Sequence, residues 1–131
     1  MKIVLKFGGT SLASPKDIRN VAKTITSFSK GNQIVVVCSA VDGVTDDLIT
    51  ISRLIEQRRK NNIVANLNGV IIKHRKLANQ TIKNSVIKKQ LLEKLNTDVS
   101  ELQELVRGLT LLKEVSARSL DYLISFGERL S

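Results

Sequence analysis

Residues 3–43, IVLKFGGTSLASPKDIRNVAKTITSFSKGNQIVVVCSAVDG, contain the pattern on which the predicted architecture rests. The run Ile3–Phe7 is rich in β-forming residues and leads directly into Gly8 and Gly9, which predicts a strand that ends in a glycine turn. The run Gln33–Cys38 is continuously apolar after its first residue and mostly β-branched. That composition is typical of a strand buried on both faces in a parallel sheet.

The segment between these two strands has the signals of a helix. Ser14 supplies an N-cap, Pro15 suits the first helical position, and Asp17 resembles the acid of a capping box. Apolar residues then recur at helical spacing up to Phe28, and Gly31 closes the helix. Strand, helix and strand in this order predict a right-handed βαβ unit with a parallel strand pair.

The rest of the sequence predicts helices. A second turn over 39–43 leads into a helix with Thr45 as a possible cap and acidic residues Asp46 and Asp47 in its first turn. Apolar periodicity then predicts three amphipathic helices, over about 64–78, 82–95 and 102–109. Ser116 caps a last helix. The fold class is therefore α/β, a short parallel sheet flanked by several helices.

Length and composition indicate one globular domain. The chain has 131 residues, of which 42% are hydrophobic and 25% charged, the range of packed proteins. A single cysteine excludes an internal disulfide. The longest apolar run, 34–38, is far shorter than the ~20 residues that cross a bilayer, so we expect a cytoplasmic protein without a membrane partner.

The positive charge is concentrated in one part of the chain. The net charge is +9, and residues 53–94 carry all of this excess. This segment contains no aromatic residue and therefore no stacking platform for single-stranded nucleic acid. A solvated helical face explains the charge better than a nucleic-acid site, and we expect no specific nucleic-acid partner.

Both strands end in turns of small residues, which should meet at one crevice because ligands bind at the carboxyl ends of parallel strands. Gly8 and Gly9 have no Cβ to block a ligand, and Lys6 can place a cation beside phosphate oxygens. The turn has neither the Walker ending nor the GxGxxG pattern. A Gly-Gly pair is by itself more often a plain tight turn than a phosphate site.

Three motifs taken together are more specific. They are Lys6-Phe7-Gly8-Gly9-Thr10-Ser11, then Ser39-Ala40-Val41-Asp42-Gly43-Val44-Thr45-Asp46, and finally Ser125-Phe126-Gly127-Glu128-Arg129-Leu130-Ser131. In order and spacing they resemble the N-terminal motifs of aspartokinases, in the amino acid kinase superfamily. The first motif also occurs in other members of the superfamily, whereas the third is far more specific to aspartokinases.

The resemblance implies a fold and a reaction. It implies the N-terminal part of the three-layer α/β/α amino acid kinase fold. It also implies ATP- and Mg²⁺-dependent phosphorylation of the β-carboxylate of L-aspartate to 4-phospho-L-aspartate, the first step toward lysine, threonine and methionine. Positioning and charge compensation carry most of phosphoryl transfer, so no Ser-His-Asp constellation is needed.

The same resemblance assigns roles to individual residues. Lys6 is the catalytic cation that neutralises the transferring phosphoryl group. The phosphate-binding set is Lys6, Gly8, Gly9 and Ser11, and the substrate-binding set is Ser39, Ala40, Thr45 and Glu128, the last for the α-ammonium group. No residue is assigned as a metal ligand.

Structural roles compete with some of these assignments. Glu128 could pair with Arg129 or an exposed lysine, and Thr45 could serve only as a helix cap, a role compatible with substrate binding. We expect Cys38 to be a small buried strand residue and His74, the only histidine, to lie at the surface or an interface. Neither receives a role in the site.

The resemblance covers essentially the whole chain, but members of the family are several times longer. We therefore expect residues 1–131 to be the N-terminal, substrate-binding part of a catalytic domain, inactive alone and self-associating through an exposed sheet edge as a dimer or larger species. Two alternatives stay open: another small-carboxylate kinase of the superfamily, and a non-catalytic assembly module that acts through segment 53–94.

Overall fold

A parallel pair of strands begins the structure, a computed structural model that describes residues 1–131. Strand β1 (Lys2–Phe7) pairs with β2 (Gln33–Cys38) in a register that runs from Lys2 opposite Gln33 to Phe7 opposite Cys38. Both predicted strands and their parallel pairing are confirmed. The 3₁₀ helix η1 (Gly9–Leu12) follows β1, and α1 (Pro15–Ser29) connects the strands.

Helix α1 begins where its local signals predict. The hydroxyl of Ser14 accepts a hydrogen bond of 3.2 Å from the backbone N–H of Asp17, and Pro15 is the first helical residue. The side chain thus satisfies one of the amides that have no partner at a helix start.

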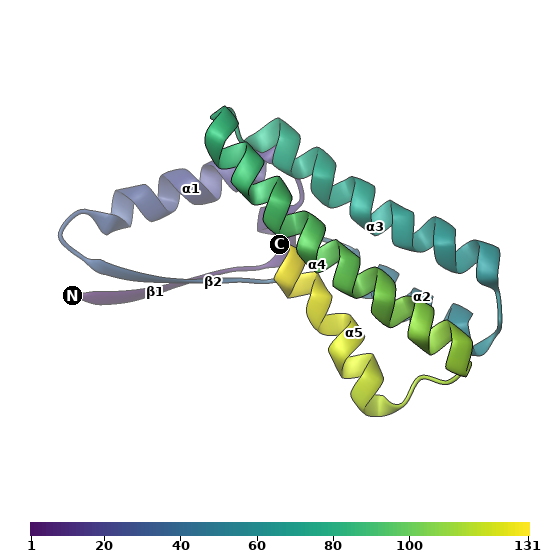
Figure 1. Cartoon of the computed structure of the whole chain (residues 1–131). Coiled ribbons are helices and arrows are strands. Elements are labelled where there is room, and N and C mark those ends of the chain that lie inside the picture. Colours follow the sequence, from purple (N-terminus) through teal and green to yellow (C-terminus); the bar gives the residue numbers. More distant parts are fainter.

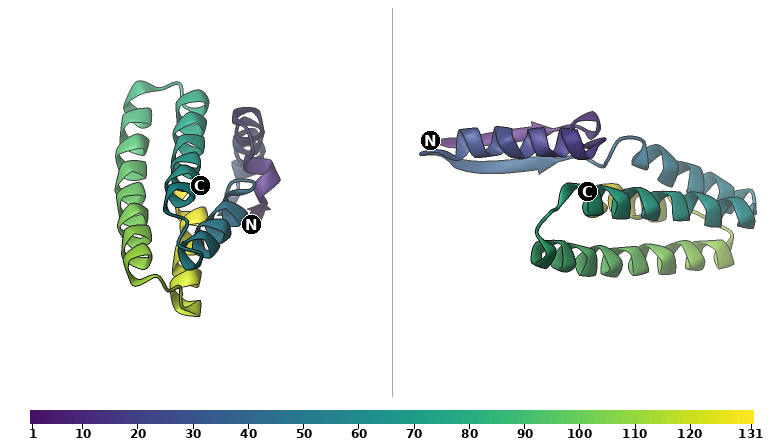
Figure 2. Two further views of the ribbon diagram at one scale, coloured as in Figure 1. Left: turned by 90° about the vertical axis from the view of Figure 1, so that its right-hand side faces the viewer. Right: turned by 90° about the horizontal axis from the view of Figure 1, so that it is seen from above.

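Four further helices pack together as a bundle: α2 (Val44–Glu56), α3 (Lys60–Thr81), α4 (Ser85–Leu112) and α5 (Ala117–Leu130). Figure 1 and the right-hand view of Figure 2 show this bundle beyond the carboxyl ends of the strands, with the C-terminus near the end of β2. The second and third of the predicted amphipathic segments, 82–95 and 102–109, are one continuous helix of 28 residues, α4. The stretch between them is helical as well, with Val99 buried in the core and its polar residues on the other side of the helix.

The hydrophobic core lies almost entirely within the bundle. Its cluster of 18 buried residues includes Leu48, Ile51, Leu102, Leu123 and Phe126, and it contains no residue of β1, β2 or α1. The bundle therefore supplies the buried apolar area that stabilises the fold, and the strands extend from it.

The expectation that β2 is buried on both faces is wrong. The side chains of Val4, Val35 and Val37, which alternate along the strands and share one face, are 66%, 53% and 44% exposed. Helix α1 packs against the sheet, where Ile3, Leu5 and Phe7 are half-buried. Cys38 is exposed as well, so the expectation that it is a buried strand residue is also wrong.

His74 also differs from its prediction, since it is 4% exposed on the inner face of α3. Its Nδ1 lies 2.7 Å from the backbone carbonyl of Val70. Burial lowers the pKa of the imidazole, the Val70 hydrogen bond partly opposes this, and the charge of Lys73 adds to it. The buried ring is therefore neutral at pH 7.

Candidate active site

The turns after the two strands lie in direct contact. The Ser39 N–H donates a hydrogen bond of 3.0 Å to the Phe7 carbonyl and so extends the ladder past β2. A Cβ placed on Gly9 would lie 3.0 Å from the Ala40 carbonyl oxygen and 3.4 Å from the backbone of Asp42. Gly9 is therefore needed for the close approach of the two backbones, whatever it binds.

The end of α5 closes against the same loop. A Cβ on Gly127 would lie 2.9 Å from the Ala40 Cβ and 3.7 Å from the Thr45 Oγ1. The Ser131 hydroxyl donates a hydrogen bond of 2.8 Å to the Ser39 carbonyl. All three motifs thus meet around Ala40, which is 5% exposed.

Loop 39–43 is held in a tight conformation before α2. The Val44 N–H donates a hydrogen bond of 3.0 Å to the Val41 carbonyl, and Gly43 has a φ of +76°, a value that favours glycine. Gly43 is also the N-cap of α2 and Thr45 is the second residue of the helix. The prediction that Thr45 caps this helix is wrong, and its half-buried hydroxyl lies beside Gly127 instead.

The first motif divides into a packed and an open part. Nothing lies within 4 Å of a Cβ built on Gly8, and the Ser11 N–H donates a hydrogen bond of 3.0 Å to the Gly8 carbonyl. The Ser11 side chain is half-buried and lines a hollow with Phe7 and Asp17. No hydrogen bond joins the Ser11 side chain to the second or third motif.

The two charged residues of the predicted site have no protein partner. Lys6 and Glu128 are exposed, and neither side chain makes a hydrogen bond or an ion pair. Arg129 is engaged elsewhere, with Asp98 at 2.7 Å and Glu101 at 2.5 Å. The alternative in which Glu128 pairs with Arg129 is therefore wrong, and its carboxylate is available to an ammonium group.

Arg129 anchors α5 to α4 beside this carboxylate. Its guanidinium lies 4.2 Å from the ring centroid of Phe126, and Tyr122 donates a hydrogen bond to Glu101. Hydrogen bonds from Arg129 and then from Tyr122 lower the pKa of Glu101 to about 2. The hydrogen bond to Glu101 raises the pKa of Tyr122. These contacts fix the last turn of α5, which carries Glu128.

Lys73 is a residue of this region that sequence reasoning missed. From α3, its ammonium donates a hydrogen bond of 3.1 Å to the Asp42 carbonyl and lies 3.6 Å from a carboxylate oxygen of Asp47. Lys73 thus connects α3 both to the loop over 39–43 and to the first turn of α2. Its sequence signal was only one lysine among many in the basic segment 53–94.

The chain offers no side-chain set of its own for a metal ion. No three or more His, Cys, Asp or Glu side chains gather closely enough to ligate one.

No helix of the structure is both long enough and apolar enough to span a membrane.

Comparisons with known proteins identify the family of the chain. Residues 1–131 match the profile of the amino acid kinase family. The chain is 33% identical to the chloroplastic aspartokinase 1 of Arabidopsis thaliana over 98% of its own length and 21% of that protein. It is also 33% identical to the aspartokinase of Candida albicans, again over 98% of the chain, and 24% of that protein. It thus spans about a fifth to a quarter of the length of these relatives.

A solved structure shows the same fold. The crystal structure of E. coli aspartokinase III in complex with aspartate and ADP superposes with a TM-score of 0.76 and 24% identity, covering 99% of this chain and 27% of that one. The expected α/β architecture, with its short parallel sheet and flanking helices, is therefore confirmed as part of this fold. A profile that matches every residue from 1 to 131, together with three motifs that converge on one loop, establishes that the chain belongs to the amino acid kinase family.

Proposed function

We propose that the chain is the substrate- and phosphate-binding part, over residues 1–131, of an aspartate kinase that transfers the γ-phosphoryl group of ATP to L-aspartate. The observation that carries the proposal is the convergence on Ala40 of three segments that are far apart in sequence, through the contacts of Gly9 and Gly127. Aspartokinases among its relatives give the substrate class, and the similar E. coli enzyme was solved with aspartate and ADP.

Each partner-free charge has a task in this reaction. A carboxylate oxygen of the aspartate side chain attacks the γ-phosphorus, the bond to the β,γ-bridging oxygen breaks, and ADP leaves with that electron pair. Lys6 compensates the charge on the phosphoryl oxygens. Glu128 binds the α-ammonium group of aspartate by a charge-assisted hydrogen bond.

The neutral residues provide shape and orientation. Gly8 leaves open space for phosphate oxygens, and Gly9 and Ser11 belong to the same turn. Ser39 and Ala40 contact the bound aspartate, and the Thr45 hydroxyl donates a hydrogen bond to a carboxylate of aspartate. A Mg²⁺ ion bound with ATP would compensate further negative charge on the phosphate oxygens.

Binding of L-aspartate to the chain tests the recognition step. We expect ¹⁵N NMR titration with L-aspartate to shift the backbone amides of Ser39, Thr45 and Glu128, and L-glutamate to bind more weakly. Glu128→Gln and Thr45→Val should each weaken binding by at least about tenfold. Glu114→Gln, which changes an exposed acid outside the motifs, is the matched control. Equal affinity in all four proteins would reject the assigned roles.

A coupled ADP-release assay tests catalysis. The chain spans 27% of the solved relative, so we expect background activity from the chain alone, because donor and acceptor must be held in line within ~3.5 Å. A fusion of residues 1–131 with the remainder of the E. coli enzyme should phosphorylate aspartate and lose this activity in Lys6→Ala. Preference of the fusion for another small carboxylate would reject aspartate as the substrate.

We also propose that the protein is cytoplasmic and that the chain associates with another copy of itself. Val4, Val35 and Val37 form an exposed apolar face on a sheet whose outer edges are unpaired, and such surfaces favour pairing with another copy. Light scattering should show a dimer or larger species that Val35→Lys dissociates. Val64→Lys, at a valine of α3 that is 59% exposed, should not, and a monomeric wild type would reject this part.

A further inference from the structure

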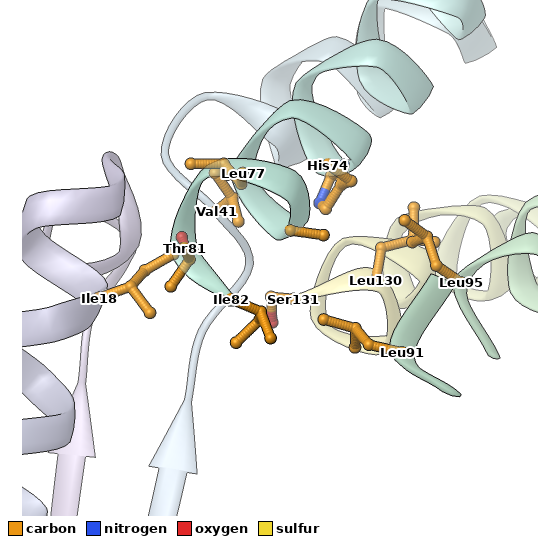
Figure 3. A pocket seen from close by; sticks show the side chains of 11 residues that line it. Ile18, Val41, His74, Leu77, Thr81, Ile82, Leu91, Leu95, Leu130 and Ser131 are labelled. Carbon is orange, nitrogen blue, oxygen red and sulfur yellow. The ribbon is translucent and has the colours of Figure 1, made fainter. Parts of the chain in front are cut away.

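A pocket lies behind the loop on which the three motifs converge. Its volume is about 220 Å³, and it is enclosed by residues of α1, α3, α4 and the end of α5. Val41 from the loop and Ser131 from the chain end belong to its wall. Figure 3 shows these side chains around a common space, with His74 and Leu77 from α3 on one side and Leu91 and Leu95 from α4 on another.

The size and lining of the pocket suit a compact apolar molecule. Eight of its eleven lining residues are hydrophobic. An apolar cavity of about 150 Å³ in another protein accepts a benzene ring, so this space accommodates a single six-membered ring with a small substituent. No lysine, arginine, aspartate or glutamate lines it, which disfavours a charged ligand such as aspartate or a nucleotide.

Two polar atoms at this wall have no protein partner. They are the Nε2 of His74 and the Oγ1 of Thr81, both buried and without a hydrogen bond. The Nδ1 of His74 faces the Val70 carbonyl at 2.7 Å, and a carbonyl only accepts hydrogen bonds. Nδ1 therefore carries the proton of the neutral ring, and Nε2 presents a lone pair. Buried polar groups are almost always paired, with protein or with water, so this acceptor can still receive a hydrogen bond from a molecule outside the chain.

We propose that this pocket binds an uncharged aromatic molecule with one O–H or N–H donor, of which phenol is the simplest. The ligand donates a hydrogen bond to Nε2 of His74. Thr81 provides a second polar contact at the same wall. The pocket is distinct from the proposed aspartate site because no charged side chain lines it, although it shares Val41, Leu130 and Ser131 with the second and third motifs. A bound ring also touches Val41 and Leu130, and it thereby braces the loop and the last turn of α5.

Titration of the 131-residue chain with phenol tests this, with toluene as a probe of similar size that has no donor. We expect phenol to bind about two- to tenfold more tightly than toluene, the increment of one hydrogen bond. Since His74 is the only histidine, its ¹⁵Nε2 resonance reports the contact directly and should shift with phenol but not with toluene. The proposal would be overturned if neither probe bound, or if the resonance shifts were confined to residues outside the pocket.

Two substitutions separate recognition from simple space filling. Ala78→Leu reduces the room at the wall and should abolish binding of both probes, whereas His74→Phe, which has no acceptor, should bring phenol down to the affinity of toluene. Thr81→Val is nearly isosteric and removes only the second polar contact, so it should weaken phenol binding less than His74→Phe does. Equal binding of phenol and toluene by the wild type, with an unchanged ¹⁵Nε2 resonance, would show that His74 is not the acceptor.

Discussion

The hydroxyl of Ser131 donates a hydrogen bond of 2.8 Å to the backbone carbonyl of Ser39, a residue 92 positions earlier in the chain. This bond joins the last turn of α5 to the loop that follows β2. Together with the contact between Gly127 and Ala40, it brings an exposed carboxylate, Glu128, to the edge of the loop. The proposed recognition of aspartate therefore depends on this junction as well as on the side chains that contact the substrate.

Gly127→Ala should destabilise the protein. The new Cβ would stand 2.9 Å from the Ala40 Cβ, so α5 or the loop must shift, at a cost of about 1–3 kcal/mol in the free energy of unfolding. Gly108→Ala is the matched control, because nothing lies within 4 Å of its added Cβ near the C-terminal end of α4. That change should stabilise the protein by about 0.5–1 kcal/mol. Urea unfolding of both variants measures the difference, and equal effects would contradict the close packing.

Arg129→Gln should raise the pKa of Glu101. The carboxyl of Glu101 has its pKa lowered to about 2 by hydrogen bonds from Arg129 and Tyr122, so loss of the guanidinium should move that pKa up toward its usual value of 4.5. A depressed carboxyl pKa stabilises the fold above 4.5, and this contribution disappears as the pH falls toward 2. Carboxyl ¹³C NMR measures the pKa. Arg118→Gln, at an arginine of α5 without an ion pair, should leave it unchanged.

Acidification should weaken the fold through His74. Its folded-state pKa lies below 6.5 because the ring is buried, so the unfolded chain binds the proton more readily and stability falls as the pH drops below about 6.5. The melting temperature should therefore decrease between about pH 8 and about pH 5, where histidine is the side chain that ordinarily titrates. His74→Gln should show a shallower decrease. An identical pH profile in wild type and variant would mean that His74 is not held neutral.

The basic segment 53–94 should not select a nucleic-acid sequence. Its charge can contact phosphates only, and such binding should fall on the order of a thousandfold between about 50 mM and about 200 mM salt because counterions are released. Fluorescence anisotropy with two duplexes of different sequence should give the same affinity at each salt concentration. A sequence-selective complex that persists at high salt would refute this expectation.

The parts of the fold that sequence predicted well are those with local causes. Ser14, Pro15 and Asp17 determine the start of α1 within four residues of chain, and the run Gln33–Cys38 forms a strand with those bounds. Exposure of the strands follows from how many elements cover the sheet. A stretch such as Val35–Val37 cannot report this, because its composition is the same in covered and uncovered sheets.

The site was predicted less evenly. The motifs indicated which residues belong together, but not that Gly43 rather than Thr45 caps α2, since both choices satisfy the same local pattern. The burial of His74 could have been inferred from its apolar neighbours three and four positions away on both sides: Val70, Ile71, Leu77 and Ala78. The role of Lys73 could not have been inferred, because this side chain bonds to a backbone carbonyl 31 positions away, that of Asp42.

The span between Ser39 and Ser131 also orders the events of folding. Helices such as α3 and α4 can form from neighbouring residues and pack as a hairpin, whereas the junction around Ala40 requires the two ends of a 92-residue separation to meet. Contacts so distant in sequence carry a large loop-closure entropy and form late. During synthesis on the ribosome the loop over 39–43 would therefore emerge early and remain without its contacts to α5 until that helix had left the exit tunnel.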